Sequence, residues 1–162
     1  MHPYFKARDF SAFIFPLTYI PVVIFILFNL KRTERLNFFM MGYCLLVLTR
    51  MAGIYFLPLC EPEGAIALHD YLLNNLFYPG GYCAVDLFYS GHTATLFLLA
   101  LVTPKPWKYS LLALTAVLGL LVIWQKVHYT IDVMAAIPIT FICYLLAKKL
   151  YYFTSKEKYT AR

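Results

Sequence analysis

The chain has 162 residues, of which 62% are apolar and 14% are charged. Soluble globular proteins are usually about 45–50% apolar and about 25% charged. A soluble domain of this size could not hide so much apolar surface, because a large share of its residues must face water. The composition therefore excludes an ordinary soluble fold, a disordered chain and a disulfide-framed secreted module. It predicts one integral membrane domain over residues 1–162, an all-α polytopic bundle of about five transmembrane helices.

Five apolar runs are candidates for membrane-spanning helices, which need roughly 20 residues, although the third run has only 12. They cover residues 10–30, 36–58, 92–103, 109–124 and 133–152. The first run is too long for a signal peptide and lacks a small-residue cleavage site, so we expect it to remain as a span. The polar connection from Glu61 to about Ser90 could include an interfacial helix over 65–78 or be a plain loop, and the sequence favours neither.

The net charge of +6 does not indicate a nucleic-acid partner. The basic residues stand in short clusters between apolar runs, and no basic stripe with interleaved aromatic residues is present. Such clusters set the orientation of membrane helices, because Lys and Arg gather on the cytoplasmic side. The clusters after the first, third and fifth runs lie on one side, so we expect a cytoplasmic C-terminus and an outward-facing polar connection. The cysteines add little, although Cys60 and Cys83 could pair on the outer side.

Two segments expected on the outer side, residues 86–93 and residues 128–133, carry ionisable side chains at membrane depth. Ionisable residues at that depth are functional candidates. In the second segment, His128 and Asp132 are four residues apart. If the last helix begins near Tyr129, the two side chains share one face about one turn apart. Asp132 could then hold one ring nitrogen of His128 and leave the other as a directed nucleophile.

The first segment leads into the short third run. Gly91 allows the backbone to approach a ligand closely, and His92 and Thr93 begin a helix whose free N–H groups favour an anion. A histidine beside an anion site is a plausible general acid. The third run covers only about 18 Å against about 30 Å of hydrocarbon. His92 is therefore expected below the outer membrane surface, unless the helix starts earlier, near Ala84.

Other interpretations of these residues stay open at this point. A Ser-His-Asp hydrolase from Ser90, His92 and Asp132 lacks a nucleophile elbow around the serine. A metal site from His92, His128 and Asp132 lacks a third histidine and the usual ligand spacing. A bis-histidine haem protein, with His92 and His128 as axial ligands, would show a Soret band. His2 and His69 have no acidic company and are assigned no role.

Ser90-Gly91-His92-Thr93 and the pattern His128-Tyr129-Thr130-x-Asp132-Val133-x-x-Ala136 resemble the two catalytic motifs of sphingomyelin synthases. These enzymes belong to the wider lipid phosphate phosphatase (type 2 phosphatidic acid phosphatase) superfamily. Asp86, four residues before Ser90, and Arg50-Met51 with Pro58 are also similar to synthase patterns. The resemblance covers the chain from about the second run to the fifth.

The resemblance implies a lipid phosphotransferase that works through a phosphohistidine, with no metal or other cofactor and with membrane lipids as partners. His128 would be the nucleophile, Asp132 would orient it, and His92 would protonate the leaving oxygen and then activate the acceptor. A lipid hydroxyl as acceptor makes the protein a transferase, and water makes it a lipid phosphate phosphatase. The residues expected to bind the phosphate or headgroup are Arg50, Asp86, Ser90, Gly91, Thr93, Lys126 and Tyr129.

The sequence departs from the family in ways that bear on the phosphate site. The phosphatase branch has an arginine upstream of the second histidine, and Val122 occupies that position here. Arg50 and Lys126 are the basic residues placed to substitute for it. The synthases have six spans, so we expect that one span is missing at the amino end. The cysteine that precedes the family's aspartate lies one residue further from Asp86 here, at Cys83.

Overall fold

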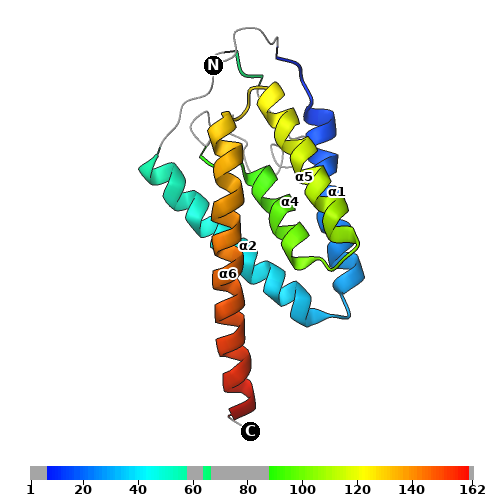
Figure 1. Cartoon of the computed structure of the whole chain (residues 1–162), viewed down its shortest axis with the longest axis vertical. Coiled ribbons are helices and arrows are strands. Elements are labelled where there is room, and N and C mark those ends of the chain that lie inside the picture. The colour runs from blue at the N-terminus through cyan, green and yellow to red at the C-terminus, as the bar shows by residue number, and fades with distance from the viewer. Residues whose placement is uncertain (1–6, 58–63, 67–87, 161–162) are drawn as a thin grey trace, which may run out of the picture.

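The computed structural model describes residues 7–57, 64–66 and 88–160, with side chains up to 153. Within this part of the chain all regular structure is helical, as the sequence predicts (Figure 1). Asp86, the Cys60–Cys83 pair and nearly all of the possible helix over 65–78 lie outside the described residues. The helices are α1 (Ser11–Asn29), α2 (Thr33–Phe56), α4 (Gly91–Val102), α5 (Trp107–Trp124) and α6 (Thr130–Thr160).

The last helix differs most from its apolar run, which covers 133–152. It starts at Thr130, three residues earlier, because the Asp132 carboxylate accepts a hydrogen bond from the Tyr129 backbone N–H at 2.9 Å. An acidic side chain in the third helical position that bonds the capping N–H closes the first turn of a helix. The helix also continues to Thr160, since hydropathy marks where a chain leaves the membrane and not where a helix ends.

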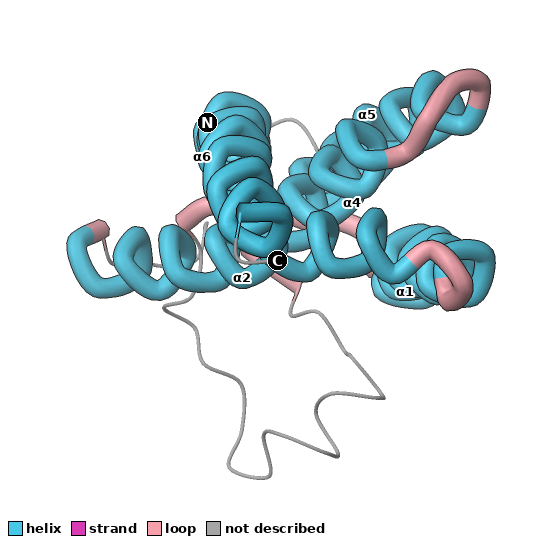
Figure 2. Tube along the Cα trace, turned by 90° about the horizontal axis from the view of Figure 1, so that it is seen from below, coloured by secondary structure: helices cyan, strands magenta, loops and turns pink. Residues whose placement is uncertain are grey.

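The short helix α4 is the centre of the bundle. It packs against α1, α2, α5 and α6, and none of these four touches all of the others. Figure 2 shows α4 between them when the bundle is viewed along its length. None of its residues is exposed, and its buried residues are Thr93, Ala94, Leu96, Leu98, Leu99 and Ala100. Close packing is helped by Gly42 of α2, where an added Cβ would stand 3.1 Å from Leu98.

Helix length separates α4 from the others. Helices α1, α2, α5 and the Thr130–Phe153 part of α6 are long and apolar enough to cross a membrane. With 12 residues, α4 covers only about 18 Å, as the sequence predicts. The alternative start near Ala84 is wrong, because residues 88–90 are not helical and α4 begins at Gly91.

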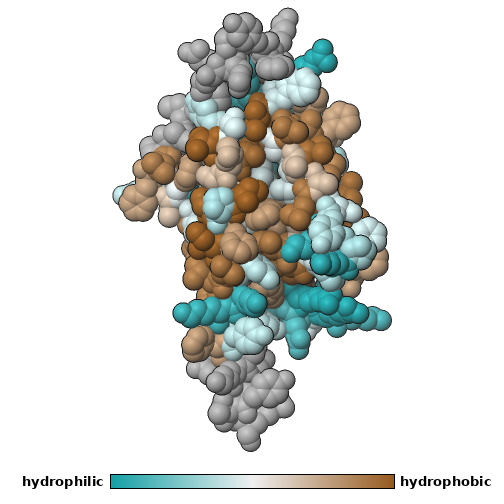
Figure 3. Space-filling model, in the orientation of Figure 1, coloured by the Kyte–Doolittle hydropathy of each residue, from teal (hydrophilic) through white to brown (hydrophobic). Residues whose placement is uncertain are grey.

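The two ends of the bundle differ in charge. Most of its side surface is apolar, and a hydrophilic band crosses one end (Figure 3). Basic residues stand at the α1–α2 and α4–α5 junctions and late in α6, which all lie towards that end (Figure 1). The N-termini of α4 and α6, which carry the two motifs, lie towards the other end. The separation of basic clusters from motifs expected from the sequence is therefore present in three dimensions.

Candidate active site

His128 and Asp132 form the core of the site at the start of α6. The His128 Nδ1 atom lies 3.7 Å from Asp132 Oδ2, and their side chains are 4% and 0% exposed. This separation exceeds a hydrogen bond, but catalytic contacts often tighten only when substrate binds. His128 Nδ1 and Asp132 Oδ1 have no hydrogen-bond partner among the described residues. Because Nδ1 faces the carboxylate, Nε2 is the ring nitrogen left to attack a substrate.

A backbone hydrogen bond joins the two sequence motifs. The N–H of Ser90 donates to the main-chain carbonyl of Asp132 at 3.3 Å. The carboxylate of Asp132 accepts from Tyr129 in the same turn, so this residue fixes the α6 start and touches both motifs. The fold therefore brings the Ser-Gly-His segment and the His-Asp pair to one corner of the bundle.

Arg50 of α2 packs directly on Gly91. A Cβ added to Gly91 would overlap the Nη1 atom of the Arg50 guanidinium. Only glycine therefore leaves room for the guanidinium to lie against the first residue of α4. A cation at a helix N-terminus combines with the free N–H groups of the first turn to favour an anion. The structure thus places Arg50, one of the two basic residues that the sequence offers in place of the missing arginine, beside the Ser-Gly-His motif.

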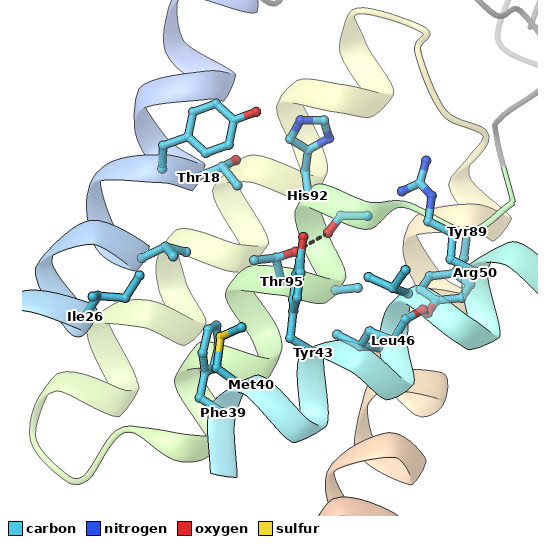
Figure 4. Close-up of a pocket in the computed structure, with 15 residues that line it drawn as sticks. Thr18, Ile26, Phe39, Met40, Tyr43, Leu46, Arg50, Tyr89, His92 and Thr95 are labelled. Carbon is cyan, nitrogen blue, oxygen red and sulfur yellow. Dashed lines mark hydrogen bonds between the residues drawn. The ribbon is translucent and has the colours of Figure 1, made fainter. Parts of the chain in front are cut away.

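His92 stands beside Arg50 at the head of a cavity of about 450 Å³ between α1, α2 and α4. The two side chains point towards the same end of the molecule, one on each side of the α4 N-terminus (Figure 4). The ring of Phe15, from α1, packs edge-on against the imidazole, with 5.7 Å between ring centroids. His128 is not among the residues that line this cavity.

A polar cluster holds the segment that precedes α4. The Tyr89 hydroxyl, 1% exposed, donates to the Leu46 carbonyl at 3.0 Å and lies 2.9 Å from Thr49 Oγ1. Cys143 Sγ of α6 is 3.7 Å from the same threonine oxygen. These contacts tie the residue next to Ser90 to the helical turn of α2 that carries Arg50. They fix the position of Gly91 relative to the guanidinium.

The sequence analysis missed Gln125, which the structure buries completely at the end of α5. Its Oε1 accepts from the Phe10 N–H at 2.8 Å, and its Nε2 donates to Ser11 Oγ at 3.0 Å and to the Ile66 carbonyl at 3.2 Å. Its own carbonyl accepts from the Ile66 N–H at 3.3 Å. One residue, three positions before His128, thus holds two distant segments, the start of α1 and the segment around Ile66. A lone glutamine at the end of an apolar run gives no sequence signal of this role.

Other predicted residues occupy different surroundings. Ser90 and Thr93 are buried and pair with each other through their hydroxyls at 3.0 Å, and neither lines the cavity beside His92. Lys126 adopts a positive φ of 59°, and its Nζ lies near Gly64, away from Gly91. Their roles in headgroup binding stay predictions. In the described part of the chain, no three His, Cys, Asp or Glu side chains group as a metal site, so the metal interpretation gains no support.

Residues 82–149 match a family model described as the C-terminal region of the PAP2 superfamily. This segment is similar to the C-terminal region of that superfamily. It contains His92, His128 and Asp132, whereas Arg50 lies outside it. The match agrees with the superfamily that the two motifs resemble, and it does not single out the synthase branch. No curated protein sequence matches the chain significantly.

A solved structure extends the similarity beyond that segment. The crystal structure of Aquifex aeolicus LpxE aligns with a TM-score of 0.65 and 22% sequence identity, over 88% of both chains. At this identity the likeness concerns the fold. Because it covers most of the chain, it includes much of the sequence outside residues 82–149. The PAP2 superfamily region therefore sits within a helical arrangement already seen in a solved protein.

Proposed function

We propose that the protein is a lipid phosphate phosphatase of the PAP2 superfamily that works through a phosphohistidine. The observation that carries this proposal is that the two motifs are in contact with each other. The Ser90–Asp132 backbone bond joins the His128–Asp132 pair to the Ser-Gly-His segment, and Arg50 packs on Gly91 of that segment. A nucleophile, its orienting acid, a second histidine and a cation are the parts that metal-free phosphoryl transfer needs.

In the first proposed step, His128 Nε2 attacks the phosphorus of a lipid phosphate ester. The bond from phosphorus to the lipid oxygen breaks, and His92 gives its proton to that leaving oxygen. Asp132 stabilises the positive charge of the phosphorylated imidazole, since its carboxylate faces Nδ1 at 3.7 Å. In the second step, His92 takes a proton from water, which attacks the phosphohistidine and releases inorganic phosphate.

Arg50 is the proposed phosphate ligand in place of the arginine that Val122 replaces. A guanidinium can bind two phosphate oxygens at once and remains charged at every physiological pH. Its place beside the first turn of α4 lets backbone N–H groups share the developing negative charge. Lys126 is a weaker candidate because it lies near Gly64.

Transfer to a lipid hydroxyl is a second candidate, because the pattern from His128 to Ala136 resembles the synthase motif closely. The superfamily match supports hydrolysis better, since it does not select the synthase branch. Both reactions share the phosphohistidine and differ only in the acceptor. We also propose that the site faces the outer side of the membrane, on the strength of the basic band at the opposite end.

Purified protein in mixed micelles tests the proposal with two reactions run in parallel. Phosphatidic acid should release inorganic phosphate, and phosphatidylcholine with fluorescent ceramide should give no new phospholipid. Formation of a ceramide phospholipid would favour transfer instead. Turnover should persist in EDTA, because the phosphoryl charge can be met by Arg50 and helix N–H groups. A Soret band with neither activity would support the haem interpretation and contradict both enzyme proposals.

A further inference from the structure

The cavity headed by His92 and Arg50 continues downwards between α1 and α2. Its lining runs along α1 from Thr18 to Ile26 and along α2 from Arg50 to Phe39. The two helices meet at their short connection and α2 runs obliquely away from α1 (Figure 1), so Ile26 and Phe39 lie at the end of the cavity near that connection and the charged residues at the other (Figure 4). At roughly 1.5 Å per residue, the α2 wall is about 16 Å long.

Below its head the cavity is lined mainly by apolar side chains and by the rings of Tyr19 and Tyr43. Two threonine hydroxyls on its walls are bonded within their own helices, since Thr18 donates to the Ile14 carbonyl at 2.9 Å and Thr95 to the Gly91 carbonyl at 2.8 Å. A threonine whose hydroxyl is bonded back to its own helix has no need of a polar partner in the cavity. A cation and an imidazole at one end of an apolar cavity fit an amphiphile with a phosphate at one end and a hydrocarbon chain at the other.

The α2 wall is also open to the side. Met40, Tyr43 and Val47 line the cavity and are 47%, 38% and 41% exposed. Their spacing of three and four residues puts them on one face of α2. A chain lying against this face would be in contact with the membrane hydrocarbon along its length. A lipid could therefore enter from the membrane without withdrawing its chain into water.

We propose that this groove between α1 and α2 binds one aliphatic chain of the lipid substrate and sets the chain length that the enzyme prefers. The proposal rests on the proposed function, because the phosphate of the same lipid would lie at Arg50 and His92. The floor is Phe39, which is 3% exposed and packs against Phe25 with 5.1 Å between ring centroids. A chain longer than the distance from Arg50 to Phe39 would have to leave the groove sideways.

Three tryptophan substitutions on exposed positions of α2 test the proposal without disturbing the buried core. Val47→Trp narrows the groove near its head, and Met40→Trp narrows it about two turns deeper. Leu48→Trp is the matched control, since Leu48 adjoins Val47, is 62% exposed and does not line the groove. Phosphate release is measured from phosphatidic acids with butanoyl, octanoyl and hexadecanoyl chains.

Val47→Trp should lower kcat/KM for the octanoyl and hexadecanoyl substrates by about tenfold or more, since several methylene contacts are lost. Met40→Trp should do so for the hexadecanoyl substrate alone. Both variants should lose much less on the butanoyl substrate than on the hexadecanoyl substrate, and Leu48→Trp, outside the groove, should match the wild type throughout. Equal losses on short and long chains, or an unchanged chain-length profile in Val47→Trp, would overturn the proposal.

A binding measurement separates failure of the groove from failure of the proposed function. Phosphatidic acid with a diazirine at the end of one acyl chain is photolysed with the His128→Ala protein, which cannot turn over. Labelling within residues 22–26 and 39–47 that excess phosphatidic acid suppresses, and that Val47→Trp reduces, supports the groove whether or not hydrolysis is found. Labelling that is not competed, or that Val47→Trp leaves unchanged, contradicts it. Absence of phosphate release with competed labelling contradicts only the proposed function.

Discussion

The two histidines of the site are held in different ways. His128 lies in a turn fixed by hydrogen bonds, in which Asp132 binds the Tyr129 N–H and Gln125 binds two distant segments, at residues 10–11 and at Ile66. His92 begins a helix held by close packing, with Arg50 against Gly91 and Phe15 against the imidazole ring. One half of the site thus depends on polar partners, and the other depends on the shape of its surroundings. Substitutions around His128 should therefore act by removing hydrogen bonds, and those around His92 by disturbing close packing.

The largest effect is expected for His128→Ala. A methyl group cannot form a phosphohistidine, so kcat/KM for phosphatidic acid should fall by about three orders of magnitude or more. The melting temperature in detergent should change little, because the Asp132–Tyr129 bond that starts α6 remains. The measurement is phosphate release, together with acid-labile labelling of the protein from radioactive substrate. His69→Ala is the control, and near-normal turnover by His128→Ala would refute the nucleophile assignment.

A smaller loss is expected for Asp132→Asn, which keeps the shape of the side chain and removes its charge. The amide oxygen can still accept from the Tyr129 N–H, but it cannot stabilise a charged imidazole at the 3.7 Å position. We expect kcat to fall by about 10² to 10⁴, as for related orienting acids. The pH dependence of kcat checks the cause. A variant that unfolds, with its remaining activity proportional to its folded fraction, would show that Asp132 acts only as a helix cap.

Gly91→Ala tests whether close packing of Arg50 on Gly91 determines the geometry around His92. The new methyl would displace the Arg50 guanidinium. Loss of its charge-assisted contact with the substrate phosphate, worth about 1.5–3 kcal/mol, should lower kcat/KM by roughly tenfold to a hundredfold. A double-mutant cycle with Arg50→Ala is decisive. In the Arg50→Ala background, Gly91→Ala should add almost nothing. Additive losses would mean that the glycine serves some purpose other than making room for the arginine.

Stability should change most at Gln125. Gln125→Leu fits the space but removes the amide that bonds the Phe10 N–H and the Ile66 carbonyl, which costs about 1–3 kcal/mol. The melting temperature in detergent should fall, and activity should fall with it. Thr115→Val is the control, since the Thr115 hydroxyl bonds only within its own helix, to Leu111 at 2.7 Å. Equal melting temperatures for the two variants would contradict the role given to Gln125.

The two ends of the bundle are also expected to face different compartments. In a background without the four native cysteines, Arg8→Cys should react with an impermeant maleimide on intact cells, and Lys31→Cys only after lysis. Both positions are exposed and lie at opposite ends of α1. Ser90 cannot serve as a probe, because it is 0% exposed. The reverse pattern would move the site to the cytoplasmic side.

The sequence predicts the helices and the His128–Asp132 pair because both depend on local spacing. Bilayer thickness sets the length of an apolar run, and the helical repeat brings together residues four apart. The Arg50–Gly91 contact joins residues 41 apart in sequence and depends on how α2 crosses α4, which hydropathy does not encode. Gln125 finds its partners at residues 10, 11 and 66, so its role exists only in the folded molecule.

The length and burial of α4 have a consequence for how the protein is made. A 12-residue helix is too short to be inserted into a membrane as an independent span. It follows that α4 enters together with α5, the helix with which it associates most extensively, as a hairpin turned at residues 103–106. His92, the proposed general acid, stands at the far end of that hairpin from its turn. His128 follows later in the chain, so the two-histidine site is among the last parts of the molecule to form during biogenesis.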